Sequence, residues 1–176
     1  MNAARFAVLG IVLTALVAGV SLYYLEVYHY YYEVNAEEAG EVQLTSVVTG
    51  EPEPILFERF EAIDADSSPK RFRACFETSL SQAMLSETYV IADEPVPQTG
   101  PAWFDCYDAR EIGEALEAGE AVGFMGVKNI EYGIDRIVAV MPDGRGFAWH
   151  QINRCGEVVF DGEPVPADCP EPPETD

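Results

Sequence analysis

The chain has 176 residues and carries 31 Asp and Glu against 10 Lys and Arg, giving a formal net charge of -21 at pH 7. A chain this acidic is repelled by nucleic acids and anionic lipid surfaces, because both are polyanions. It attracts cations and basic proteins instead. Hydrophobic residues make up 48% of the sequence, which excludes a disordered acidic chain and predicts one folded domain with accessory segments.

An uncharged apolar segment runs from Phe6 to Tyr24. A helix needs about 20 apolar residues to cross the hydrocarbon core of a membrane. We therefore expect a retained transmembrane helix over residues 6–25. The alternative is a cleaved signal peptide, and residues 17–19 (Val-Ala-Gly) would serve as its cleavage site. The apolar segment continues past that site, which favours the anchor.

The distribution of basic residues predicts how the helix is oriented. Arg5 is the only Lys or Arg before Arg59. The positive-inside rule then places the N-terminus in the cytoplasm of a bacterium and the rest of the chain in the periplasm. We expect five parts: a cytoplasmic stub (1–5), the transmembrane helix (6–25), a Tyr-rich juxtamembrane segment with a polar spacer (26–41), a periplasmic domain (42–169) and an acidic Pro-rich tail (170–176).

Four cysteines lie in the predicted domain, at positions 75, 106, 155 and 169. None forms a CxxC or CxxCH motif or a zinc-finger pairing with histidine. An even number of cysteines in an oxidising compartment predicts two disulfides. Three pairings are possible, and we expect sequence neighbours to pair, as Cys75–Cys106 and Cys155–Cys169.

The residue patterns of the domain predict an α+β fold with a mainly antiparallel sheet and one or two helices. A helix is indicated over residues 79–87, and a second begins after the capping residue Asp108 and ends at Gly119. Residues 55–63 fit a short helix or a strand. Strands are predicted over residues 42–50, 72–76, 88–92, 121–127, 133–141, 146–152 and 157–160.

His150 is the only histidine in the predicted domain. If Asp143-Gly144 forms a two-residue hairpin turn, Asp135 and His150 share one face of the sheet and can pair. A hydrolase would also need a nucleophile, and the sequence contains no G-x-S-x-G elbow. A polar pair on the sheet is the simpler interpretation, so an enzyme that uses Asp135 and His150 is the least favoured hypothesis.

Two further patterns favour structural roles. Asp64 and Asp66 begin a calcium-loop pattern, but Pro69 and Cys75 stand where that loop needs Gly and Glu, which indicates an ordinary turn. The only basic cluster follows the turn, and among so many carboxylates we expect it to form internal ion pairs rather than a phosphate site. Its members are Lys70, Arg71 and Arg73.

Six of the nine tyrosines lie at the end of the apolar segment or just after it. They are Tyr23, Tyr24, Tyr28, Tyr30, Tyr31 and Tyr32. Aromatic side chains concentrate at membrane interfaces, where we expect these six to lie. If the helix continues through residue 33, the tyrosines fill one half of its circumference, and Glu26, His29 and Glu33 fall on the other. Those three could bind a metal, but a single exposed stripe offers no second shell, so a protonated His29 between two glutamates is the simpler interpretation.

Three segments carry a resemblance to a known family: "AIDADSSP" (62–69), "WFDCYDA" (103–109) and "NIEYGIDRIVAVMPDGRGFAWHQINRCGE" (129–157). The chain resembles an uncharacterised family whose members look like single-span inner-membrane proteins of Rhodobacter-type alphaproteobacteria with a small periplasmic domain. No activity is established for that family, so the resemblance assigns no functional residue. It implies a Gram-negative inner membrane.

These observations favour a non-catalytic accessory protein, an assembly factor or small subunit that works beside a larger inner-membrane complex. The alternative is an acidic docking module that recruits a basic periplasmic partner such as a c-type cytochrome. Both hypotheses place the protein in the inner membrane through residues 6–25. Neither requires a cofactor, a catalytic residue or nucleic acid.

Overall fold

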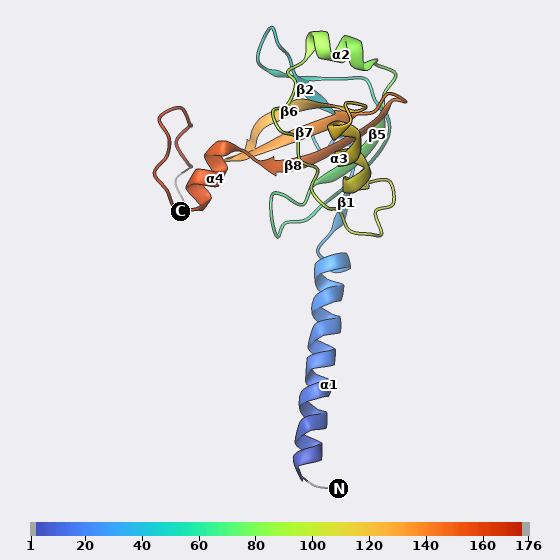
Figure 1. Ribbon diagram of the computed structural model, residues 1–176, viewed down its shortest axis with the longest axis vertical. Coiled ribbons are helices and arrows are strands. Elements are labelled where there is room, and N and C mark those ends of the chain that lie inside the picture. The colour runs from blue at the N-terminus through green and yellow to red at the C-terminus, as the bar shows by residue number, and fades with distance from the viewer. Residues whose placement is uncertain (1–2, 174–176) are drawn as a thin grey trace.

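The computed structural model describes residues 3–173, so positions 1–2 of the predicted stub and 174–176 of the predicted tail lie outside the described residues. A long helix projects from a domain built around a sheet (Figure 1). The helix α1 (Ala3–Tyr24) continues into a π-helical turn (Leu25–His29), and α1 has no buried residue. Together they form a span of 27 residues, Ala3–His29, in which an 18-residue window has mean hydropathy 2.3, so the span is long and apolar enough to cross a membrane.

The domain contains a six-stranded antiparallel sheet in the order β1-β4-β5-β8-β7-β6. This confirms the predicted α+β class with a mainly antiparallel sheet. The strands are β1 (Tyr32–Val34), β4 (Glu58–Asp64), β5 (Arg73–Glu77), β6 (Val122–Glu131), β7 (Ile134–Val140) and β8 (Arg145–Ile152). The predicted spacer over residues 26–41 therefore contributes a strand to the domain.

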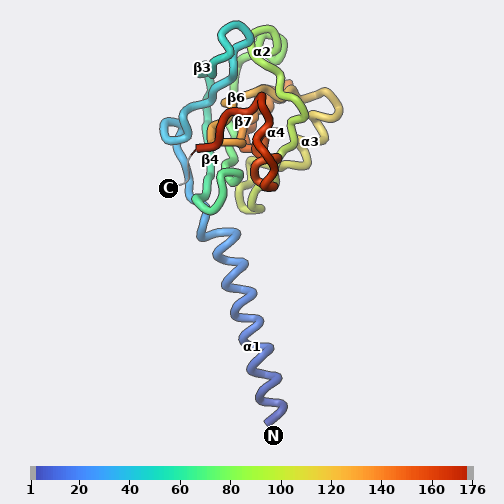
Figure 2. Tube along the Cα trace, turned by 90° about the vertical axis from the view of Figure 1, so that its left-hand side faces the viewer, coloured from blue at the N-terminus to red at the C-terminus, as the bar shows by residue number. Residues whose placement is uncertain are grey.

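A small second sheet and two helices pack on the main sheet, and a third helix lies against the turn at Gly133. The sheet pairs β2 (Gln43–Thr45) with β3 (Pro52–Pro54), and the helices are α2 (Gln82–Thr88), α3 (Ala109–Glu117) and α4 (Arg154–Phe160). Both views place α2 and the β2–β3 hairpin at the end of the domain far from α1 (Figures 1 and 2). Asp108 caps α3 as predicted, since its side chain accepts the N–H groups of Arg110 and Glu111.

Two hydrophobic cores lie on opposite faces of the sheet. Val138 and Val140 pack with Leu44 and Leu85 on the side of β2 and α2. Ile137 and Ala139 belong to the other core, which includes Ile112 of α3 and the fully buried Trp149. Because β7 is covered on both faces, all its residues are buried and its sequence shows no polar alternation.

The hairpin between β7 and β8 differs from the predicted two-residue turn. Val140 pairs with Gly146, and the N–H of Met141 bonds the carbonyl of Arg145, so three residues form the loop. Gly144 has φ 91°, as the last residue of a three-residue hairpin loop often does. Since side chains alternate along a strand, the one-residue shift sets His150 opposite Arg136 and Asp135 opposite Gln151.

Two other predicted strands were wrong. Residues 157–160 belong to α4, because the Asn153 side chain accepts the N–H of Gly156 and caps a helix at this point. Residues 88–92 form no named strand and contribute only isolated bridges, Ser46–Tyr89 and Ile91–Phe124. Residues 55–63, which fitted either a short helix or a strand, form a strand from Glu58 onward.

Both disulfides have the expected neighbour pairing. Cys75 of β5 bonds Cys106 in the loop before α3, with Cα atoms 6.2 Å apart. Cys155 of α4 bonds Cys169 in the C-terminal segment, with Cα atoms 5.7 Å apart. Two disulfides and no free cysteine within residues 3–173 indicate an oxidising compartment.

Candidate functional site

The end of the long helix is fixed to the domain by two side chains. The last carbonyls of a helix have no partner within the helix and need donors from elsewhere. The indole N–H of Trp103 donates to the carbonyl of Val27 at 2.6 Å, and the Arg71 guanidinium donates to the carbonyl of Glu26 at 3.2 Å. A cation at this position also suits the negative end of the helix dipole.

An ion pair and stacked rings surround these two hydrogen bonds. Arg71 also binds the carboxylate of Glu26 at 2.8 Å and lies 5.5 Å from the centre of the Tyr31 ring. The Trp103 ring stacks with Tyr28 at 6.3 Å and meets Tyr31 edge-on at 6.0 Å. We call Glu26, Tyr28, Tyr31, Arg71 and Trp103 the helix-exit collar. It joins the helix to the domain through side chains as well as through the peptide chain.

The basic cluster predicted to form ion pairs divides into two roles. Arg71 forms the predicted pair, with Glu26. Arg73 is buried and makes no ion pair within the described residues; its guanidinium donates instead to backbone carbonyls. Burial lowers the pKa of Arg73, which stays cationic at neutral pH. The carbonyls belong to Lys70, Phe72, Gln98 and Thr99, so Arg73 holds the loop that leads to Trp103.

The prediction of one helix through residue 33 is wrong. The π-helical turn ends at His29, and Tyr30 follows as its last hydrogen-bonded residue, with its N–H bonded to the carbonyl of Leu25 at 3.1 Å. Pairing with β4 then draws Tyr32 into an extended strand opposite Asp64. The six tyrosines therefore do not share one helical face. Tyr32 donates its hydroxyl to Asp66 at 3.0 Å, and this bond raises the pKa of Tyr32 to about 12.

The three metal candidates are separated for the same reason. Glu26 is engaged by Arg71, and the His29 ring lies against Tyr24 and Tyr30. Glu33 stands on β1 opposite Ile63. Within residues 3–173, no group of three or more His, Cys, Asp or Glu side chains could hold a metal ion.

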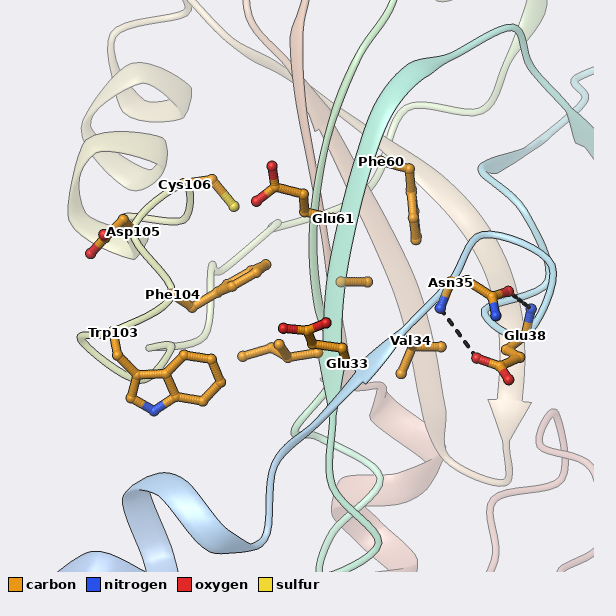
Figure 3. Close-up of a pocket in the computed structure, with 12 residues that line it drawn as sticks. Glu33, Val34, Asn35, Glu38, Phe60, Glu61, Trp103, Phe104, Asp105 and Cys106 are labelled. Carbon is orange, nitrogen blue, oxygen red and sulfur yellow. Dashed lines mark hydrogen bonds between the residues drawn. The ribbon is translucent and has the colours of Figure 1, made fainter.

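A groove of about 710 Å³ lies beside the collar, along the edge of β4 (Figure 3). Four carboxylates and three aromatic rings line it, and its lining includes no Lys, Arg or His. The carboxylates are those of Glu33, Glu38, Glu61 and Asp105, and the rings are those of Phe60, Trp103 and Phe104. Trp103 belongs to both the collar and the groove. We call this feature the edge groove.

The edge groove encloses the outer edge of β4 from both faces of the sheet. Glu61 and Glu33 point to the side of the Trp103–Cys106 loop, whereas Phe60 and Val34 lie on the side of the Asn35–Glu38 turn (Figure 3). This follows from the registry, in which Glu33 pairs with Ile63 and Val34 with Ala62. One wall is therefore acidic and aromatic, and the other is mainly apolar.

The chemistry of these walls selects for positive charge. Carboxylates bind ammonium and guanidinium groups, and the faces of aromatic rings attract the same cations. Glu61, Glu33 and Asp105 form no ion pair within the described residues, so they remain available to a ligand. The edge groove is thus suited to a basic ligand with apolar parts.

Asp135 and His150 do not form the pair considered from the sequence. Asp135 accepts the N–H of Asn129 and the amide of Asn153, both at 2.8 Å, and so braces the hairpin and the start of α4. His150 is buried and uses both ring nitrogens: Nδ1 bonds the carbonyl of Pro69 at 2.6 Å, and Nε2 accepts from Arg136 at 3.1 Å. The hydrogen-bond partners of the two side chains among the described residues are amide, carbonyl and guanidinium groups.

Sequence reasoning missed the edge groove because no local pattern marks it. Its acidic wall combines Glu33, Glu61 and Asp105, which lie far apart in the chain and meet through strand pairing and the Cys75–Cys106 disulfide. The only usable signal was the aromatic "WF" at positions 103–104 beside a cysteine.

Residues 42–170 match a family of unknown function (DUF6446), and the chain belongs to that family. The match covers the domain apart from β1 and excludes the long helix. No curated protein and no solved structure shows significant similarity to the chain.

Proposed function

We propose that this member of the DUF6446 family is a non-catalytic accessory protein, anchored by α1 in a bacterial inner membrane, that holds a partner protein beside the membrane surface. The observation that carries the proposal is the helix-exit collar. Trp103 and Arg71 tie the domain to the last turn of the helix, so the edge groove has a set position relative to the helix. An enzyme with a tethered, freely moving domain would not need this connection.

Two features of the chain support a periplasmic location for the domain. Arg5 on the N-terminal side of the helix favours a cytoplasmic N-terminus, and the two disulfides favour a periplasmic domain. The tyrosines from Tyr23 to Tyr32 then lie near the periplasmic surface of the inner membrane. There an aromatic ring can contact the apolar edge of the lipid while its hydroxyl group stays in water. An alphaproteobacterial source, as the sequence resemblance implies, fits this location.

The partner is either a membrane complex or a soluble basic protein. The four carboxylates of the edge groove favour a partner that presents positive charge. A mobile carrier such as a cationic c-type cytochrome is the soluble alternative, and its association would weaken as salt screens the charges. A subunit of a membrane complex would remain bound after detergent extraction at physiological salt.

Affinity purification of the tagged full-length protein from native membranes tests the proposal. The full-length protein should carry a stoichiometric partner, and Arg71→Gln should reduce its recovery severalfold. Arg110→Gln is the matched control, because Arg110 lies exposed on α3 and makes only a weak pair with Glu114 at 4.0 Å. Recovery of the protein alone, in detergents that preserve known membrane complexes, would refute the accessory role.

The anchor requires a separate measurement, since signal sequences resemble membrane helices in length and composition. The intact mass of the membrane-extracted protein should include residues 1–25. A mature chain that begins near residue 20 would lack the membrane anchor, although it would keep the collar residues, and the proposal of an anchored protein would fail.

A further inference from the structure

We propose that the edge groove binds its partner by strand addition. An extended basic segment would lie along the outer edge of β4 and continue the line of β1. This inference rests on the proposed function and specifies how the partner is held. Three features of the domain support it: an unpaired strand edge, a groove that surrounds that edge, and walls that differ in charge.

The unpaired edge results from the shortness of β1. β4 extends over Glu58–Asp64, but β1 pairs with only its last three residues, Ala62–Asp64. After Val34 the chain leaves the sheet through the Asn35–Glu41 turn, where the N–H of Ala39 bonds the carbonyl of Asn35 at 2.9 Å. Within residues 3–173 no strand pairs with the outer edge of residues 58–61. Such an edge presents unpaired N–H and C=O groups that can accept another strand.

The site is short, because a bulge interrupts β4. The register with β5 shifts between Glu58 and Glu61, and Arg59 has φ 49°, which turns the backbone at this point. The open ladder is therefore centred on Phe60 and Glu61, both of which line the groove. A bulge of this kind also discourages long edge-to-edge pairing between copies of the chain.

The two walls predict the side-chain pattern of the added strand. Residues that point to the loop side would meet Glu61, Glu33 and Asp105 next to the Trp103 ring, which favours Lys or Arg. Residues that point to the other side would meet Phe60 and Val34, which favours apolar side chains, while the Glu38 carboxylate on that side accepts the N–H of Asn35. The expected segment alternates basic and apolar residues, since strand side chains alternate between faces.

The chain itself offers two other possible occupants of the edge groove, and both are acidic. The segment after Cys169 contains Glu171, Glu174 and Asp176 and no basic residue. A second copy of the chain carries the same net charge of -21, so electrostatic repulsion opposes its entry. A basic segment from a different protein is the occupant that charge complementarity selects.

Peptide binding to the full-length protein in detergent micelles tests the mode of binding. The probe is a fluorescein-labelled, end-capped eight-residue peptide of alternating Lys and Val, measured by fluorescence anisotropy. A second peptide has the same sequence with N-methyl groups on alternate backbone nitrogens, which preserves charge and removes hydrogen-bond donors. We expect the methylated peptide to bind about tenfold more weakly, which corresponds to the loss of about two backbone hydrogen bonds.

A charge variant tests whether the peptide binds in the edge groove. Glu61→Gln should weaken binding of the unmethylated peptide about two- to fivefold, as expected for partly exposed charge pairs. Glu117→Gln, at an exposed position of α3 outside the groove, should leave binding unchanged. Equal affinity for the two peptides, or equal effects of the two variants, would overturn the inference.

The outcome also distinguishes this inference from the proposed function. If a partner co-purifies with the wild-type protein and is not displaced by the Lys–Val peptide, the accessory role stands and strand addition at the edge groove fails. If no partner co-purifies, the accessory role itself fails, whatever the peptide result.

Discussion

Acidification should destabilise the domain through His150. The imidazole is buried between β7 and the Phe72 ring, which stacks on it at 4.8 Å, and its two nitrogens are engaged by Arg136 and the Pro69 carbonyl. Burial, together with the nearby cations of Arg136 and Arg73, lowers the pKa of His150 from 6.5 to about 4. The folded protein therefore holds a neutral ring with its proton on Nδ1.

The sign and size of the effect follow from proton linkage. Below pH 6.5 the unfolded chain takes up a proton at this histidine, and the folded chain does not until the pH approaches 4. The free energy of unfolding therefore falls as the pH is lowered through this window. Each pKa unit corresponds to about 1.4 kcal/mol, so the full effect is about 3 kcal/mol. Asp64, whose pKa is raised by burial, acts in the opposite direction.

The assay is urea denaturation between pH 7.5 and pH 4.5, with His150→Gln as the comparison. Glutamine keeps one donor and one acceptor but does not titrate, so the variant should lose this part of the pH dependence while keeping the contribution of Asp64. His29→Gln is the matched control, because His29 lies exposed at the helix exit. An NMR titration in which His150 showed a pKa near 6.5 would contradict a buried neutral ring, as would an unchanged pH slope in His150→Gln.

Three further variants and one matched control test the supports of the edge groove and the fold. Replacing Cys75 and Cys106 by alanine opens a loop with a sequence separation of 31 and should lower the free energy of unfolding by about 3–4 kcal/mol in urea titrations; no change would show that the bridge is dispensable. Trp103→Phe removes the hydrogen bond to the helix end but keeps a ring, so spin-label distances between helix and domain should broaden in nanodiscs; an unchanged distribution would contradict a stabilising collar. Gly156→Ala forces a methyl group against the neighbouring hairpin backbone and should cost about 1–3 kcal/mol. Gly113→Ala points into open space on α3 and should stabilise by about 0.5–1 kcal/mol, so equal effects would disprove the contact.

The sequence predicted the parts of the fold that depend on local patterns. The cap at Asp108 rests on residues that are close in the chain, and the disulfides join cysteines that follow one another in the sequence; the structure has both as expected. The helix over residues 154–160 was missed because "EVVF" has strand propensity, and the Asn153 cap decided the conformation. The tyrosine segment was misread because tertiary pairing of β1 with β4 ended the helix at His29.

The candidate site could not be predicted from the sequence for a related reason. A one-residue difference in hairpin loop length placed His150 opposite Arg136, on the sheet face opposite to the one that Asp135 occupies. The edge groove depends on how far β1 pairs along β4, and a three-residue strand leaves no periodicity to detect. Its acidic wall is assembled from three separate segments, so only the folded chain shows it.

Site-specific photocrosslinking in native membranes tests the central claim most directly. The photoreactive residue p-benzoyl-phenylalanine would replace Phe60 in the edge groove, with a control placement at Glu117 on α3. We expect one main protein adduct from position 60, mapped to a segment of alternating basic and apolar residues and abolished by excess Lys–Val peptide. Crosslinks only to lipid, only to a second copy of the chain, or with the same pattern from both positions would contradict it.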